Sequence, residues 1–341
     1  AMPAVDEVFM SQSARITLLL LLFSVAVVIA ITSGKYSLTV NELWTVVSSK
    51  LTGHIEESRT ATVFWQIRLP RVLAAILIGG GLAIAGAAYQ GMFRNPLVSP
   101  DILGVSSGAG VGAVLGIFLG HSMLSIQLFA FVGGLITVAL VYFIAKLAKQ
   151  QDPVLSLVLV GIAISALCGS AISLMKILAD PYTQLPSITF WLLGGLSTIT
   201  APDLLSVAPL MLLGFIPLIL LRWRMNILSL SDEEARSLGL NVEITRLIFI
   251  LSATLITASA VSIAGIIGWL GLIVPHIARL LVGANFGYQL PISLLVGATM
   301  LLITDTLART IANIELPLGI LTSAIGAPFF LMLLLKTRRD R

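Results

Sequence analysis

The sequence predicts an all-α membrane protein with ten transmembrane helices and both termini in the cytoplasm. Of its 341 residues, 57% are hydrophobic and only 11% are charged, and the mean hydropathy is +1.04. A typical soluble domain has about 25% charged residues, so this chain has too few to cover a water-exposed surface. Its apolar residues form continuous runs, whereas β-barrel strands alternate apolar and polar residues over segments of roughly ten. The membrane-spanning segments are therefore predicted to be helices.

Composition and charge exclude several other classes of protein. Cys168 is the only cysteine, so no intrachain disulfide can form. Glycine and proline are dispersed along the chain, unlike in collagen or in low-complexity segments. The net charge of +4 and the pI near 9.4 could suggest nucleic-acid binding. In a membrane protein a basic excess more often reflects topology, and we expect no nucleic-acid partner.

Ten apolar runs approach the length of about 20 residues that a helix needs to cross a bilayer. The predicted spans are 16–33, 69–92, 102–120, 124–145, 154–176, 204–221, 244–264, 266–282, 290–308 and 316–335. They form a single transmembrane domain, 1–341. The first run is longer than the hydrophobic region of a secretory signal peptide, which is about 7–15 residues. It is therefore expected to be a span.

An even number of spans places both termini on one side of the membrane. With cytoplasmic termini, thirteen Lys and Arg residues fall in inner segments and seven in outer segments. Cytoplasmic loops usually carry the excess of Lys and Arg, which favours this orientation. The outer count is raised by one long loop, 34–71, with Trp44 and Trp65 near its ends. We interpret this loop as an interfacial amphipathic stretch.

The most polar stretch of the chain is the inner segment 222–243, between the sixth and seventh spans. Within it, residues 229–240 predict a short helix. Ser231 can cap its N-terminus, Glu234 has the position required for a capping box, and Gly239 can end the helix. A third connecting segment, 180–203, contains several Pro and Gly residues and predicts a short outer helix followed by a turn.

Two spans carry a small residue at every fourth position. In the third span these are Gly104, Gly108, Gly112, Gly116 and Gly120, and in the fifth they are Gly161, Ser165, Gly169 and Ser173. Residues at this spacing share one helix face and let a second helix approach closely. The alternative is that this smooth face lines a path for a bulky solute. The candidate path or packing residues are Gly104, Ser107, Gly108, Gly112, Gly161 and Ser165.

Ionisable residues inside the spans are few. Asp305 and Arg309 lie four residues apart on one helix face and can pair, either for structure or for function. His276 and Arg279 lie near the inner end of the eighth span, and without a second His or a Cys nearby they predict no metal site. The sequence lacks a G-x-x-x-x-G-K-[ST] phosphate loop. Active transport would therefore draw its energy from another subunit.

Five strings closely resemble the permease family of iron-siderophore, haem and cobalamin ABC importers. They are RLPR at 68–71, NPL at 95–97, LGVSSGAG at 103–110, GLIVPHIAR at 271–279, and LPLG at 316–319 followed by GAP at 326–328. The resemblance covers residues 64 to 336. It implies an ABC importer permease fold that works as a homodimer of ten-helix subunits in the bacterial inner membrane.

The resemblance also implies partners and a substrate class. Two ATPase subunits would bind on the cytoplasmic side, and a periplasmic substrate-binding protein would dock on the outer face. ATP and Mg²⁺ would belong to the ATPase, so this chain would bind no cofactor and would not be an enzyme. The substrate would be a metal chelate such as a ferric siderophore, haem or a cobalamin, or an oxyanion such as molybdate.

The functional residues of the family can be transferred to matching positions. The segment 229–240 resembles the coupling helix that contacts the ATPase, with Ser231, Glu234, Ala235, Arg236 and Gly239 as its matching residues. The outer arginines that dock the binding protein correspond to Arg68, Arg71 and Arg309, and charged docking of this kind mainly fixes orientation. The cytoplasmic gate falls near Val154 and Leu155, an apolar pair that would close by hydrophobic constriction.

Two other classes of function have weaker support in the sequence. An ion-coupled secondary transporter needs polar groups near the midplane of the bilayer, and Asp305 is the one embedded candidate. An intramembrane enzyme would need a clustered nucleophile and base, and the sequence shows neither. The importer permease is therefore the leading prediction, and the secondary transporter is the alternative.

Overall fold

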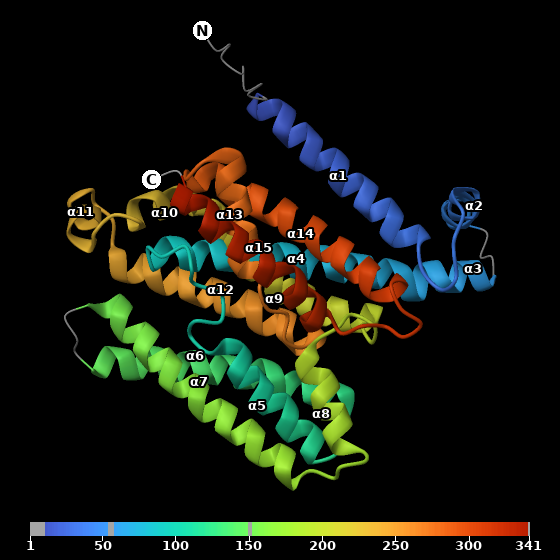
Figure 1. Ribbon diagram of the computed structural model, residues 1–341, viewed down its shortest axis with the longest axis horizontal. Coiled ribbons are helices and arrows are strands. Elements are labelled where there is room, and N and C mark those ends of the chain that lie inside the picture. Colours follow the sequence, from blue (N-terminus) through green and yellow to red (C-terminus); the bar gives the residue numbers. More distant parts are fainter. Residues whose placement is uncertain (1–10, 54–57, 149–151, 340–341) are drawn as a thin grey trace.

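The computed structural model describes residues 11–53, 58–148 and 152–339, and within these ranges the regular structure is helical (Figure 1). Seven helical segments of the described chain are long and apolar enough to cross a membrane. They are α1 (Gln12–Thr32), α4 (Leu69–Met92) together with the short α3 (Arg59–Thr62) and the π-helical η1 (Val63–Arg68) that precede it, α6 (Met123–Leu147), α7 (Pro153–Leu178), α9 (Ala201–Leu220), α12 (Val242–Ala264) and α14 (Phe286–Thr310).

The remaining predicted spans also coincide with helices. The helices α5 (Val105–Phe118) and α13 (Leu270–Val282) have 14 and 13 residues, and α15 (Leu318–Arg339) is apolar over Leu318–Leu333. Four short elements lie between the long helices: α2 (Val40–Leu51), α8 (Gln184–Leu193), α10 (Arg222–Leu228) and α11 (Asp232–Ser237). The all-helical prediction is confirmed for the described residues, among which seven helical segments have both the length and the hydropathy of a membrane crossing, fewer than the ten predicted spans.

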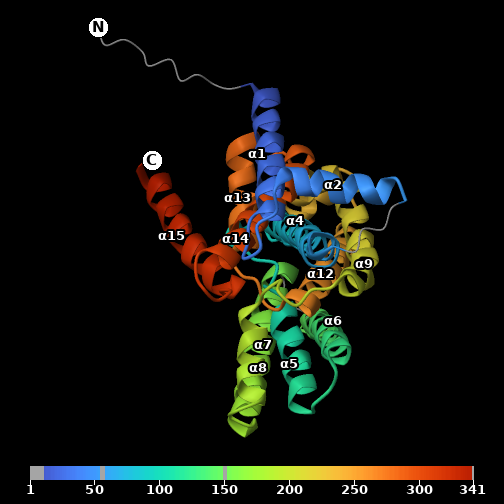
Figure 2. The ribbon, with the colours of Figure 1, turned by 90° about the vertical axis from the view of Figure 1, so that its right-hand side faces the viewer.

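The helices form two layers that meet along α12. One layer contains α1, α4, α9 and α12 to α15, and the other contains α5 to α8 (Figures 1 and 2). The helix α12 contacts α4 and α9 on one side and α5 and α6 on the other. Most of α4 is buried, and its alanines and glycines let neighbouring backbones approach closely. Gly79, for example, lies against Gly297 of α14.

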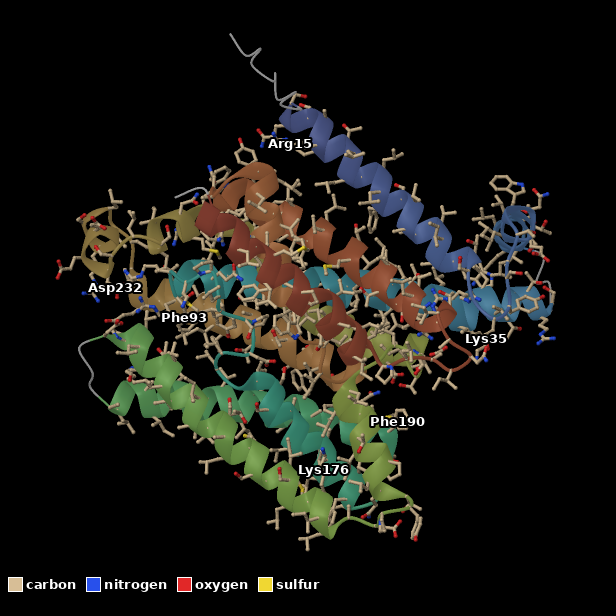
Figure 3. All side chains as sticks on the ribbon, viewed as in Figure 1. Arg15, Lys35, Phe93, Lys176, Phe190 and Asp232 are labelled. Carbon is tan, nitrogen blue, oxygen red and sulfur yellow. The ribbon has the colours of Figure 1, made fainter. Side chains whose placement is uncertain are left out.

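The two ends of the molecule differ. The start of α1, the end of α15, α10 and α11 lie toward one end, while α2 and α3 lie at the opposite end (Figure 1). Among the labelled side chains, Asp232 and Phe93 lie at the first end and Lys35 at the other (Figure 3). The start of α1 and the end of α15 thus lie nearer to α10 and α11 than to α2 and α3.

The third predicted span is shorter than expected at both ends. Gly104 caps the N-terminus of α5 with φ of 78°, and Gly120 follows the helix with φ of 74°. Both values fall in the left-handed region that favours glycine, so neither residue belongs to the glycine face of the helix. Only Gly108, Gly112 and Gly116 remain on it. The prediction of five aligned glycines is therefore wrong at its two ends.

The remaining glycines of α5 pack against α6. A Cβ atom on Gly108 would lie 2.6 Å from the carbonyl oxygen of Gly133, and one on Gly112 would overlap the backbone at Phe129. Neither position has room for a side chain. The helix-packing interpretation is therefore confirmed for this face.

Replacing Gly112 by leucine is expected to destabilise the protein by about 1–3 kcal/mol or more, because overpacking forces backbones apart. Ser24, an exposed position in the middle of α1, is the control, because a larger side chain there does not enter a helix contact. Thermal unfolding of the purified Gly112→Leu and Ser24→Leu variants would measure the difference. An equal loss of stability in both variants would contradict the close packing of α5 on α6.

Candidate functional site

The predicted coupling helix is present as α11, and its caps are those that the sequence indicates. The Ser231 hydroxyl accepts from the Glu234 backbone N–H at 3.3 Å, and the Glu234 carboxylate accepts from the Ser231 N–H at 3.1 Å. At the other end Gly239 has φ of 83°, and the Leu240 N–H donates to the Ala235 carbonyl, as in a Schellman motif. The capping box and the glycine stop are therefore confirmed.

The side chains of α11 divide between an anchored face and an exposed face. Ala235 is fully buried, whereas Glu234, Arg236 and Leu238 are exposed. Arg236 lies 3.6 Å from the Glu243 carboxylate at the start of α12. Hydrogen bonds from Ser231 lower the pKa of the Glu234 carboxyl below its ordinary value, so it is charged at neutral pH. The exposed face thus combines the charged side chains of Glu234 and Arg236 with the apolar side chain of Leu238.

Asp232, a residue that the sequence analysis did not single out, holds α11 in place. Its carboxylate accepts from the Arg246 guanidinium of α12 at 2.9 Å and lies 3.8 Å from that of Arg94. Arg94 also donates to the Leu230 carbonyl at 3.0 Å. It lies just after α4, with φ of 52°. The coupling segment is therefore tied both to α12 and to the connection between α4 and α5.

The connection between α4 and α5, residues 93–104, continues from Arg94 to the second layer of helices. Gln90 donates to the Val98 carbonyl at 3.2 Å. A Cβ atom on Gly161 would lie 3.3 Å from Leu103 Cα, and one on Gly104 would lie 2.7 Å from Ser165 Oγ. Two of the predicted path residues of α7 thus contact this connector, which links the coupling segment to α7.

The predicted gate residues lie in the first turn of α7. The Asp152 carboxylate caps this turn by accepting from the N–H groups of Val154 and Leu155 at 2.9 and 3.3 Å, and Pro153 occupies the first helical position. Leu155 is exposed, whereas Val154 packs against the core. Their role as a gate depends on a second subunit and stays a prediction.

The predicted path residues are less accessible than a path requires. Gly104, Gly108, Gly112 and Gly161 are buried between helices, while Ser107 and Ser165 are half-buried. The buried glycines serve helix packing in this conformation. Their contribution to a translocation path stays a prediction.

The predicted docking arginines are buried at the opposite end of the molecule. Arg68 and Arg309 each have 6% of their surface exposed. Arg68 donates to the backbone carbonyls of Ile31, Ser33 and Tyr36, and Arg309 donates to those of Ala30 and Ser33. Cations near the C-terminus of a helix interact favourably with its dipole and its free carbonyls. Arg68 and Arg309 therefore cap the C-terminus of α1, and their burial does not favour contact with a binding protein. Their docking role stays a prediction.

Arg71 belongs to an adjacent network of buried charges. Its guanidinium lies 2.9 Å from the Asp305 carboxylate and 3.1 Å from that of Glu315. Asp305 also lies 3.4 Å from Arg309, so the predicted pairing of Asp305 with Arg309 is confirmed. The shorter contact with Arg71 joins α4 to α14. It spans 234 residues of sequence, and no local pattern could have indicated it.

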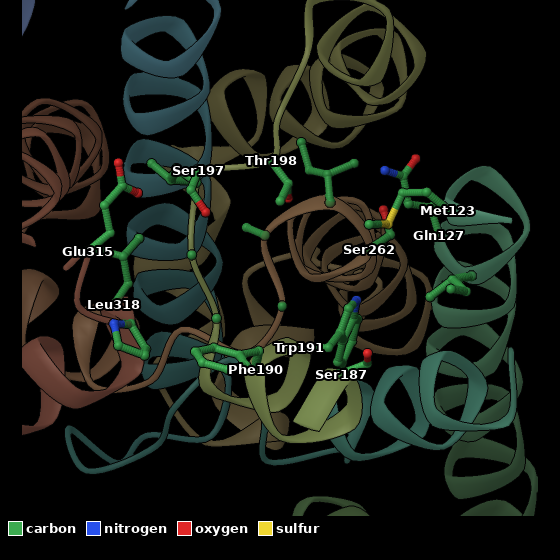
Figure 4. A pocket seen from close by; sticks show the side chains of 18 of the residues that line it. Met123, Gln127, Ser187, Phe190, Trp191, Ser197, Thr198, Ser262, Glu315 and Leu318 are labelled. Atoms are coloured by element: carbon green, nitrogen blue, oxygen red, sulfur yellow. The ribbon is translucent and has the colours of Figure 1, made fainter. Parts of the chain in front are cut away.

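A cavity of about 590 Å³ lies beside this network, where α4 begins and α12 ends. Ser197, Thr198 and Glu315 line one side, and the rings of Phe190 and Trp191 line the other (Figure 4). The lining is mainly apolar, and Arg71 and Glu315 add opposite charges to it. Within the described ranges no three His, Cys, Asp or Glu side chains are placed to hold a metal ion. The cavity has the dimensions of a small-molecule site. The one sequence feature that points to it is the Pro- and Gly-rich segment 180–203, part of which lines it.

The amino-acid sequence is similar to a family of transport proteins and to several of its members. A model of the FecCD transport family matches residues 20–336. The molybdate import system permease protein MolB of Haemophilus influenzae is 40% identical over 321 residues, which cover 94% of this chain and 95% of MolB. A probable iron chelatin transport system permease protein of Helicobacter pylori is 42% identical over 320 residues, covering 92% of this chain and 95% of the relative.

A solved structure is similar over nearly the whole chain. It is described as an inward-facing conformation of a metal-chelate type ABC transporter. The TM-score is 0.84 and the sequence identity is 39%, with 96% of this chain and 100% of the other covered. The two-layer arrangement of helices thus corresponds to that of a known transporter.

Proposed function

Because the chain belongs to the FecCD transport family, we propose that it is the membrane-spanning permease subunit of an ATP-driven importer for a metal chelate. It is a multi-pass protein of the inner membrane. The observation that carries the proposal furthest is the match of family and fold over nearly the whole chain. The capped and anchored α11, at the end of the molecule where an ATPase would bind, supports it.

For the substrate we propose a metal chelate, with an oxyanion as the second candidate. A relative named for iron chelatin and a structure described as a metal-chelate type transporter support the first, and a relative named for molybdate supports the second. The ion-coupled alternative depends on Asp305, which is buried between two arginines. This pairing favours a structural role for Asp305.

For the assembly we propose ten crossings with cytoplasmic termini, two copies of the permease, two ATPase subunits that bind ATP and Mg²⁺, and a periplasmic binding protein. The common side of the start of α1, the end of α15 and α11 supports the topology (Figure 1). The outer face of α7 supports a second copy, because Leu159, Ile162 and Leu167 leave it apolar and exposed.

For coupling we propose that α11 receives the movement of the ATPase and passes it on by two routes. Asp232 and Arg246 lead to α12, and Arg94 leads to the connector 93–104 and then to Gly161 of α7. The second route reaches the helix that carries the predicted gate residues, Val154 and Leu155. Chains of packed side chains and salt bridges can transmit such a movement when they have two discrete arrangements.

Uptake by the reconstituted permease is expected to depend entirely on its ATPase partner. Proteoliposomes would contain the permease with or without the ATPase, with ATP on the ATPase side and the binding protein outside. Accumulation of a radiolabelled ferric chelate is expected only in the complete system, and labelled molybdate tests the second substrate. Uptake by the permease alone would contradict the proposal and favour a secondary transporter.

A further inference from the structure

The short helix α2 exposes an apolar stripe to its surroundings. Val40, Trp44 and Leu51 recur at intervals of four and seven residues and therefore share one face. Val47 borders this face but is half-buried, because it packs against the cluster around Val46. We call Val40, Trp44 and Leu51 the α2 apolar face. The exposed fractions of Val40, Trp44 and Leu51 are 68%, 74% and 83%. Large apolar side chains are rarely left so exposed together unless they contact a partner or a membrane.

The orientation of this face is fixed by the opposite edge of α2. Val46 is buried in a small cluster with Leu38 and Phe64. The Lys50 ammonium lies 3.8 Å from the centre of the Trp65 ring, a cation–π contact. At the N-terminus Thr39 and Glu42 form a capping box. The helix is thus anchored on one edge and cannot turn its apolar face inward.

If α1 crosses the bilayer, α2 lies at the membrane surface, because it follows α1 after a short connection. The 21 residues of α1 rise about 1.5 Å each, which gives roughly 31 Å, close to the hydrocarbon thickness of about 30 Å. The helix α2 begins eight residues after α1 ends. Figure 2 shows that it runs across α1, not along it, and extends from the bundle on the side opposite to α15.

A helix that lies flat at the end of a span faces hydrocarbon on one side and water on the other. The polar residues Asn41, Thr45 and Ser48 lie on the side of α2 away from Val46 and are suited to water. Tryptophan and tyrosine are enriched at the membrane–water interface. The junction between α1 and α2 is held rigidly, because Arg68 and Arg309 bind the last carbonyls of α1.

We propose that the α2 apolar face inserts into the interface of the outer phospholipid leaflet and fixes the depth of α1 in the membrane. Interfacial helices of this kind bury their apolar face about 5–10 Å into the boundary between headgroups and acyl chains. The occupant is the lipid surface itself. The proposal rests on the proposed topology, in which α1 crosses the membrane from the cytoplasm, and it is independent of the substrate and of ATP.

The test compares two neighbouring positions in a background without native cysteine, Cys168→Ser. Single variants Trp44→Cys and Thr45→Cys carry a nitroxide spin label in vesicles of phosphatidylcholine and phosphatidylglycerol. The label at position 44 is expected to be relaxed several-fold more by oxygen than by a water-soluble nickel chelate, and the label at position 45 shows the reverse. Equal access of the nickel chelate to both positions would overturn the proposal.

A second measurement keeps the native tryptophan in place. Fluorescence of the unmodified protein and of Trp44→Phe is recorded in vesicles with brominated phosphatidylcholine, and the difference reports Trp44 alone. Bromine near the headgroups is expected to quench this difference strongly, and aqueous iodide is expected to quench it weakly. Strong quenching by iodide that is relieved only when the binding protein is added would show a protein-docking face and overturn the lipid assignment.

Discussion

Asp305→Ala is expected to lower the free energy of unfolding by about 3–5 kcal/mol, because it leaves two buried arginines without their shared partner. Asp305 has 2% of its surface exposed, and its carboxylate lies 2.9 Å from Arg71 and 3.4 Å from Arg309. Both guanidinium groups lie in an environment with little water. Thermal or denaturant unfolding of the purified protein would measure the loss, provided that the variant is produced in folded form.

Glu315 provides the matched control for Asp305. It contacts the same guanidinium of Arg71 at 3.1 Å, but 38% of its side chain is exposed. Water can therefore replace the lost carboxylate, and Glu315→Ala is expected to cost less than about 1 kcal/mol, as for other exposed ion pairs. If both alanine variants lost equal stability, the charge network at the outer end would not be anchored by Asp305.

The conservative variant Asp305→Asn distinguishes structure from ion coupling. In an importer driven by ATP, this variant should be less stable but should retain ATP-dependent uptake in the fraction that folds. Complete loss of uptake by a fully folded Asp305→Asn protein, with no effect of the ATPase, would favour the secondary transporter. Stability and uptake therefore have to be measured on the same preparation.

Features that depend on neighbouring residues could be predicted from the sequence. The caps of α11 are an example, since Ser231, Glu234 and Gly239 act within one short segment. The pairing of Asp305 with Arg309 is another, because four residues correspond to one helical turn. The positions of the apolar helices follow in the same way from continuous apolar runs, although their exact ends do not.

Features that depend on distant contacts could not be predicted. Arg68 looks like an exposed outer arginine in the sequence, yet it folds back onto carbonyls 32 to 37 residues earlier. The role of Asp232 depends on Arg94, which is far away in sequence and close only after folding. The start of α5 was misplaced because Gly104 adopts a left-handed conformation, which composition alone does not reveal.

Asp232→Ala is expected to uncouple ATP hydrolysis from uptake in the assembled transporter. Hydrogen bonds to charged groups contribute about 1.5–3 kcal/mol, so the equilibrium between the anchored and the detached positions of α11 should shift roughly tenfold or more toward detachment. The side chain links α11 to Arg246 at 2.9 Å and to Arg94 at 3.8 Å. The measurement is the ratio of substrate imported to ATP hydrolysed. Glu233→Ala, an exposed neighbour in the same turn, is the control and should leave this ratio unchanged.

Substitutions on the exposed face of α11 should have a different effect on transport from substitutions of Asp232, which holds α11 in place. Arg236 is exposed and does not contact Asp232, so Arg236→Glu is expected to weaken ATPase binding while the bound ATPase stays coupled. Asp232→Ala should leave binding intact and reduce the uptake ratio. Because the two variants alter different steps, their effects on uptake should multiply.

Two further variants distinguish the two routes from α11. If Arg94→Gln alone reproduced the Asp232→Ala phenotype and Arg246→Gln did not, the connector 93–104 would be the principal route by which movement is passed on. The opposite result would assign that role to α12.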